Sequence, residues 1–203
     1  MHNQDNTIGQ YETVVLLHGF LAPAFVMHPL RIRLTWLGYN AVVWHYPSIF
    51  PSIQTHSARF RDFLKEQDAS GSRFHIVAHS MGSVVTRSAL VESKLSNLGR
   101  LVFLAPPSRG TPIARWAPRF LKRFILPLKE LEDIPSSFVN QLPESTGFET
   151  GIVEAKFDIL VPAAKTHLKV EAAHCTVNGT HNSILLSSHV ARLVDRFLRS
   201  GSF

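Results

Sequence analysis

Short apolar, β-rich runs alternate with helical patterns along this chain, and that alternation constrains the fold more than any other feature of the sequence. We expect strands at Thr13–Leu17, Asn40–Tyr46, Phe74–Ala78, Leu101–Leu104, Thr150–Phe157 and Ala173–Val177. We expect helices at Pro29–Leu37, Thr55–Gln67, Met81–Glu92 and Ser183–Arg199. Strands that alternate with helices are typical of a parallel sheet with crossover helices. The sequence therefore predicts an α/β fold with a mostly parallel sheet.

Residues 106–148 interrupt this alternation. They contain seven prolines and no clear helical or strand period, and a basic stretch with apolar residues crosses them. Such a segment is typical of an excursion from the core and not of another strand–helix unit. A chain of 203 residues is long enough for one sizeable core. We therefore expect a single domain over residues 1–203, with 106–148 as an irregular cap.

The sequence also bears on the compartment. The N-terminal stretch MHNQDNTIGQYETVV has neither the basic nor the apolar region of a signal peptide. No apolar run approaches the roughly 18 residues that span a bilayer. One cysteine, Cys175, excludes an internal disulfide framework and fits a reducing compartment. These features predict a cytoplasmic protein, and peripheral contact with a membrane stays open.

The formal net charge is +6, and much of it lies in residues 109–129. The cations of this segment are Arg109, Arg115, Arg119, Lys122, Arg123 and Lys129. Aromatic and aliphatic residues separate them, which suits an anionic lipid surface at least as well as a phosphate backbone. A solvated cationic face over a packed helix explains the same pattern. Scattered prolines and interleaved aromatics argue against a nucleic-acid partner.

The stretch FHIVAHSMGSVVTR, residues 74–87, places Ser80 between a strand pattern and a helical pattern. A serine raised on a tight strand-to-helix turn is a nucleophile elbow, which needs small residues two positions before and after it. Ala78 and Gly82 occupy those positions, giving A-x-S-x-G. A serine that merely caps the following helix is the alternative interpretation. The flanking strand and helix favour the nucleophile.

A nucleophilic serine needs a base, and the base needs a carboxylate that orients it. Ligands in open α/β sheets gather beyond the carboxyl ends of the strands, and His181 and Asp158 are both expected there. Among the eleven histidines His174 is the main rival as base. Other acids between Ser80 and His181 include Glu132, Asp133, Glu154 and Glu171. Asp158 directly follows its strand, whereas Asp133 is expected at the surface and Glu154 within the strand body.

An acyl-transfer site also needs donors for the oxyanion of its tetrahedral intermediate. The backbone N–H of Met81 begins the helix after the serine, and the HGF loop after the first strand offers the N–H of Phe20. Donors of this kind act through backbone position. Met81 and Phe20 are therefore the predicted oxyanion donors.

Four stretches resemble α/β-hydrolase-fold serine esterases and lipases of the small bacterial triacylglycerol-lipase type. They are VVLLHGF, VAHSMGS, RLVFLAPPSRGTPIA and the final portion from Asp158 through GTHNSIL. The resemblance thins between about Ile113 and Gly147. Ser83 stands where a second glycine is frequent, and Ile159 where glycine often follows the acid, which leaves the subfamily open.

The resemblance implies an α/β-hydrolase fold, with about six strands in a mostly parallel sheet and helices on both faces. It implies Ser80, Asp158 and His181 as nucleophile, acid and base, and neither metal nor organic cofactor. The expected activity is hydrolysis of a small-molecule or lipid ester through an acyl-enzyme. Thioesterase, amidase or acyltransferase activity shares this triad, and a non-catalytic binding protein of the same fold is a further alternative. Acyl-chain preference and oligomeric state stay open.

Overall fold

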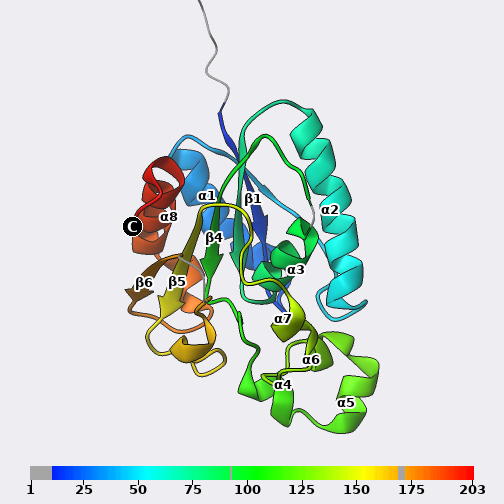
Figure 1. Ribbon diagram of the computed structural model, residues 1–203. Coiled ribbons are helices and arrows are strands. Elements are labelled where there is room, and N and C mark those ends of the chain that lie inside the picture. The colour runs from blue at the N-terminus through cyan, green and yellow to red at the C-terminus, as the bar shows by residue number, and fades with distance from the viewer. Residues whose placement is uncertain (1–10, 92, 169–171) are drawn as a thin grey trace, which may run out of the picture.

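The computed structural model describes residues 11–91, 93–168 and 172–203, which form one six-stranded sheet with helices packed against it (Figure 1). The strands are β1 (Thr13–Leu17), β2 (Asn40–Val43), β3 (Phe74–His79), β4 (Leu98–Leu104), β5 (Thr150–Ala155) and β6 (Ala173–Val177). Their order is β2-β1-β3-β4-β5-β6, and all neighbouring pairs are parallel. The predicted α/β fold with a parallel sheet is confirmed.

The longer helices cover both faces of this sheet. They are α1 (His28–Trp36), α2 (Ile53–Ala69), α3 (Met81–Leu90) and α8 (Ser188–Ser200). Side chains alternate along β1, so that Val14 and Leu16 join a core with α1 and α8, whereas Val15 and Leu17 join a second core with α2 and α3. The two cores lie on opposite faces of the sheet (Figure 1).

Several element ends differ from the predicted ones. The second strand ends at Val43, although the Trp44 N–H still donates to the Leu16 carbonyl at 2.9 Å. The fifth strand ends two residues early. The predicted helix from Ser183 is a 3-10 turn, η3 (Ser183–Leu186), and α8 starts only at Ser188 because Ser187 caps it. Glu92, the predicted end of the third helix, lies outside the described residues.

Between β4 and β5 the chain forms four short helices and no further strand–helix unit in its described part. They are α4 (Pro112–Trp116), α5 (Arg119–Phe124), α6 (Leu126–Glu130) and α7 (Phe138–Gln141). These helices lie beyond the carboxyl end of the sheet, at the bottom of Figure 1. We call residues 106–148 the cap segment.

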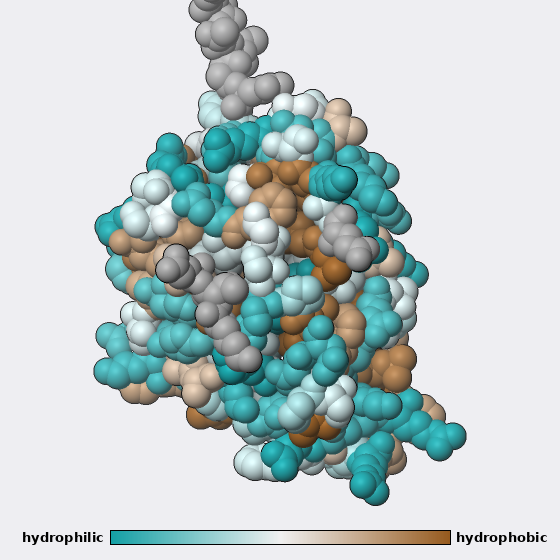
Figure 2. Space-filling model, in the orientation of Figure 1, coloured by the Kyte–Doolittle hydropathy of each residue, from teal (hydrophilic) through white to brown (hydrophobic). Residues whose placement is uncertain are grey.

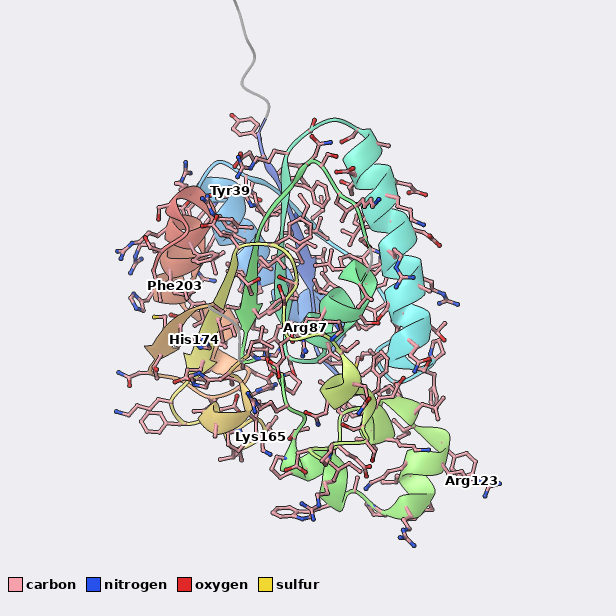
Figure 3. All side chains as sticks on the ribbon, viewed as in Figure 1. Tyr39, Arg87, Arg123, Lys165, His174 and Phe203 are labelled. Carbon is pink, nitrogen blue, oxygen red and sulfur yellow. The ribbon has the colours of Figure 1, made fainter. Side chains whose placement is uncertain are left out.

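A buried arginine holds both ends of the cap segment. Arg87 of α3, only 4% exposed, donates hydrogen bonds to the carbonyls of Ser108 and Pro143, each at 3.0 Å. Figure 3 places Arg87 between α3 and the start of the cap segment. Burial lowers the pKa of its guanidinium to about 10. Arg87 therefore joins the first and last turns of the cap segment to the core.

Within the described ranges, no helix has the length and apolar character that crossing a bilayer requires.

Candidate active site

Ser80 lies on a sharp turn between β3 and α3. Its φ of 50° and ψ of −125° are unusual for any residue but glycine. Within the described residues its side chain accepts no hydrogen bond from the helix that follows, so the helix-cap interpretation is wrong. The Ser83 hydroxyl and N–H both donate to the Ser80 carbonyl, at 2.7 and 2.9 Å. Ser83, where glycine is frequent in the resembling group, thus braces the turn.

Two glycines permit the close approach of the backbone around this turn. A Cβ atom on Gly82 would lie 2.7 Å from the His18 carbonyl oxygen. A Cβ atom on Gly19 would lie 2.8 Å from the Cβ of Ser80. Both distances are far below van der Waals contact, so only glycine fits without a backbone shift. The loop after β1 therefore lies directly against the serine turn.

The structure brings the three predicted residues into one hydrogen-bonded chain. Nε2 of His181 lies 2.8 Å from Oγ of Ser80, and Nδ1 lies 2.6 Å from Oδ2 of Asp158. The N–H groups of Leu160 and Val161 donate to Oδ1 of Asp158 at 2.9 and 2.8 Å. The Asp158 side chain is 1% exposed and that of His181 is 9% exposed. These hydrogen bonds are therefore largely shielded from water.

His79 supports this chain in a way that sequence reasoning missed. Its Nε2 lies 2.9 Å from the His181 carbonyl oxygen, so it donates that hydrogen bond. Burial, with the nearby His181 ring, lowers the pKa of His79 to about 3, so the ring is neutral. The available signal was a histidine directly before Ser80, at the end of a strand that is mostly apolar.

The alternative residues lie in other surroundings. His174 is exposed on β6 and stacks on His167, with ring centroids 4.3 Å apart (Figure 3). Glu154 is buried and accepts hydrogen bonds from Thr166 and Thr176 at 3.1 and 2.6 Å. The expectation of a surface position for Asp133 is wrong, since its side chain is 10% exposed and pairs with Lys165 at 3.1 Å.

Two further acids complete this set. Glu132 forms an ion pair with Lys122 within the cap segment, and Glu171 lies outside the described residues.

Contacts with Tyr46 fix the position of the loop that carries Phe20. The Tyr46 hydroxyl donates to the His18 carbonyl at 2.6 Å, and the two rings stack with centroids 4.3 Å apart. Burial raises the pKa of Tyr46 and lowers that of His18, so both groups are neutral. Among the described residues, the N–H groups of Phe20 and Met81 have no hydrogen-bond acceptor. Both are thus free to donate to a ligand near Ser80.

A cavity of about 840 Å³ extends from Ser80 and His181 beneath the cap segment. Most of its lining is apolar, including Phe20, Leu21, Phe25, Ile113, Leu121, Ile125, Leu128, Leu131, Leu160, Val161, Leu185 and Leu186. Its size and lining suit a ligand with an apolar chain. Within the described part of the chain, no group of three His, Cys, Asp or Glu side chains is arranged to hold a metal ion.

A serine on a strand–helix elbow, with a histidine and an acid at later strand ends, defines a site of the α/β-hydrolase type. The chain belongs to the alpha/beta hydrolase family, whose model matches residues 14–196. Among functionally curated proteins, none matches this sequence significantly.

Solved structures share the fold at low sequence identity. A phospholipase from Legionella pneumophila superposes with a TM-score of 0.79 at 16% identity, over 95% of this chain and 60% of that one. A Bacillus licheniformis lipase in its mature form gives 0.76 and 16%, over 95% and 93% of the two chains. An Aspergillus fumigatus lipase gives 0.77 and 17%, over 93% and 52%. This chain thus spans 60% of the phospholipase and about half of the fungal lipase.

Proposed function

We propose that the protein is a serine hydrolase of carboxylic esters that works through an acyl-enzyme. The observation that carries the proposal is the continuous chain from Ser80 Oγ through both nitrogens of His181 to Asp158, with contacts of 2.8 and 2.6 Å. This chain meets the geometric requirement for a base-activated nucleophile. Two free N–H groups beside it, on Phe20 and Met81, support the same chemistry.

In this mechanism Ser80 Oγ attacks the ester carbonyl while Nε2 of His181 accepts its proton. Asp158 holds the Nδ1–H tautomer and stabilises the imidazolium that forms. The N–H groups of Phe20 and Met81 donate to the oxyanion of the tetrahedral intermediate. Its collapse breaks the bond to the alcohol, which leaves with the proton from His181. Water then attacks the acyl-enzyme by the same steps and releases the acid.

The cavity favours esters with an apolar acyl group. Leu121, Ile125 and Leu128 of the cap segment line the same cavity as Ser80, so a hydrocarbon chain would bury its surface there. Two of the structural neighbours are named as a phospholipase and a lipase, which is compatible with such a substrate. A lipid ester is therefore the substrate class that we propose.

A fluorophosphonate probe tests the nucleophile directly, because it reacts only with an activated serine. Wild-type protein should label, and Ser80→Ala should not. Ser57→Ala is the control, since Ser57 is also buried but lies on α2, where it donates to the Ile53 carbonyl. Equal labelling of wild type and Ser80→Ala overturns the proposal.

Substrate panels separate ester hydrolysis from its alternatives. Nitrophenyl esters of rising chain length should be hydrolysed with increasing kcat/KM until the cavity is full. A thioesterase would prefer matched acyl thioesters, and an acyltransferase would give product only with an added acceptor alcohol. A non-catalytic binding protein would show neither labelling nor turnover.

A further inference from the structure

The helices α4 to α6 of the cap segment carry three chemically different sets of side chains. Leu121 and Ile125 line the cavity that leads to Ser80. Lys122 and Arg123 turn to a second hollow on the other side of α5. A third set consists of rings that line neither hollow: Trp116, Phe120 and Phe124 are 77, 65 and 66% exposed. None of these rings belongs to either hydrophobic core, so packing in the core does not account for their presence.

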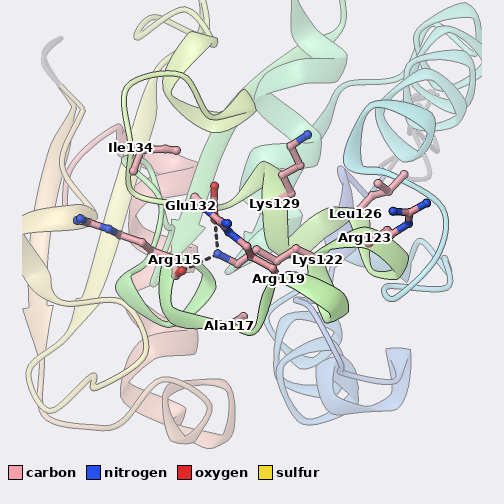
Figure 4. Close-up of a pocket in the computed structure, with 9 residues that line it drawn as sticks. All are labelled: Arg115, Ala117, Arg119, Lys122, Arg123, Leu126, Lys129, Glu132 and Ile134. Carbon is pink, nitrogen blue, oxygen red and sulfur yellow. Dashed lines mark hydrogen bonds and ion pairs between the residues drawn. The ribbon is translucent and has the colours of Figure 1, made fainter.

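The second hollow is strongly cationic. It has a volume of about 730 Å³ and is lined by Arg115, Ala117, Arg119, Lys122, Arg123, Leu126, Lys129, Glu132 and Ile134 (Figure 4). Lys122 is neutralised by Glu132. In the described part of the chain, no carboxylate pairs with the other four cations of the hollow. The hollow therefore has a net positive charge that a bound anion would balance.

The cationic hollow adjoins the mouth of the substrate cavity. Ala117 lines both hollows. Ile113, Leu21 and Leu186 line the cavity and are also 44, 63 and 60% exposed, so the mouth has an apolar rim. Hydrophilic side chains project from the molecule where α5 lies, with apolar ones between them (Figure 2), and Arg123 extends outward there (Figure 3).

We propose that residues 112–130 dock the protein on an anionic phospholipid surface, an inference that rests on the proposed hydrolysis of lipid esters. Lipid phosphates would occupy the cationic hollow. Trp116, Phe120 and Phe124 would enter the boundary between headgroups and acyl chains, where aromatic rings are stabilised. This arrangement presents the apolar mouth of the cavity to the lipid. Phosphates of a nucleic acid would satisfy the cations, but they leave the exposed rings and apolar rim unexplained.

The test measures binding without turnover. Ser80→Ala protein is mixed with vesicles of phosphatidylcholine alone or with 30 mol% phosphatidylglycerol, a fraction of about one third chosen to give a negative surface. Bound protein is separated by flotation. We expect partitioning to the mixed vesicles to exceed that to neutral ones at least about tenfold, and to weaken as salt screens the surface charge. Equal partitioning to both vesicles overturns the proposal.

Matched variants locate the surface. Arg119→Gln with Arg123→Gln should reduce partitioning about 10- to 30-fold, since each cation near such a surface contributes about fivefold. Arg59→Gln with Arg192→Gln removes the same charge from exposed positions on α2 and α8, and should leave partitioning unchanged. Equal losses in both pairs overturn the proposed location.

The exposed tryptophans give a second comparison. Trp116→Ala should weaken partitioning several-fold. Trp36→Ala removes an equally exposed ring, 81% against 77%, from the end of α1 and should have no effect. All of these vesicle experiments measure binding and none measures catalysis. A negative result in them would therefore contradict the docking proposal without affecting the fluorophosphonate test of the proposed catalytic function. Tighter retention on duplex DNA than on mixed vesicles would assign the hollow to nucleic acid instead.

Discussion

Asp158 faces His181 with one carboxylate oxygen while the backbone holds the other. Oδ2 lies 2.6 Å from Nδ1 of His181, and Oδ1 accepts the N–H groups of Leu160 and Val161. The carboxylate therefore cannot rotate without losing two hydrogen bonds. This orientation keeps a proton on Nδ1 and leaves Nε2 as an acceptor for the Ser80 hydroxyl.

Replacing Asp158 by asparagine should preserve the fold and remove the tautomer control. The amide of Asn can donate to Nδ1 and so favours the wrong tautomer, with the proton on Nε2. We expect kcat for a nitrophenyl ester to fall by about 10⁴, as for an equivalent change in a serine protease. Thermal unfolding provides the control for folding, and a loss of less than tenfold in kcat would contradict the assigned role.

His79 should act as a positioning residue for His181. His79→Leu removes the donor to the His181 carbonyl, and a shift of the ring by about 1 Å can lower kcat as much as about 100-fold. His79→Gln offers an amide N–H at a similar reach, so it should recover most of that loss while KM changes little. Equal kcat values for the two variants would show that the hydrogen bond does not position the base.

Four buried histidines should make the protein less stable in acid. Burial lowers the pKa of His18, His56, His75 and His79 below 6.5. Below about pH 6.5 the unfolded chain therefore binds more protons than the folded one. The free energy of unfolding consequently decreases as the pH is lowered.

His79 alone should account for about 1.4 kcal/mol per pH unit between about pH 6 and its folded pKa of about 3. Urea midpoints at pH 7.5 and 5.0 measure the effect. The difference between them should be smaller in His79→Gln, and an unchanged difference would count against a buried neutral ring.

Gly82→Ala tests the close approach at the serine turn. The new Cβ would lie 2.7 Å from the His18 carbonyl oxygen, so either α3 or the loop after β1 must move. We expect a loss of about 2–4 kcal/mol in the free energy of unfolding and a large loss of kcat. Ser83→Ala removes one hydrogen bond nearby and should cost only about 1 kcal/mol. Equal stability losses would mean that the loop yields easily.

Arg87→Met tests the anchoring of the cap segment. It leaves the carbonyls of Ser108 and Pro143 without their donor, for an expected loss of about 2–4 kcal/mol in stability. Limited proteolysis should then cleave first within residues 106–148. Arg61→Met is the matched control, because its guanidinium donates to the Ser88 and Ala89 carbonyls outside the cap segment. Identical cleavage patterns would exclude the anchoring role.

The sheet could be predicted because its strands carry strong local signals. Runs such as TVVLL and LVFL are strongly apolar and contain β-branched residues, which favours buried strands. Their alternation with helices leaves few possible topologies for the sheet. The ends of elements depend on capping hydrogen bonds instead. Ser52 accepts from Thr55 N–H and starts α2 before the predicted Thr55, just as Ser187 delays α8. A single capping serine does not change the spacing of the apolar residues, so the hydrophobic pattern alone does not locate the end of the helix.

The candidate site could be predicted in part because it depends on the same strand signals. Ser80, Asp158 and His181 each follow a strand, and parallel strands bring such positions to one edge. Contacts between distant segments left no local signal. His79 meets the carbonyl of a residue 102 positions away, and Arg87 reaches Pro143 across 56. The cationic hollow likewise depends on how α4, α5 and α6 turn against one another.

The hydrogen bond between Ser80 and His181 joins residues 101 positions apart and has a consequence for biosynthesis. Strand β3 pairs with β1 and β4, whereas His181 follows β6, the edge strand that pairs with β5 and comes last in the sequence. Such distant pairings form late, because long loops must close first. A nascent chain that stops short of His181 carries its serine on the turn without a base. The proposed reactivity thus requires the C-terminal part of the chain as well as the elbow, so we expect a chain that ends before His181 to leave a fluorophosphonate probe unreacted.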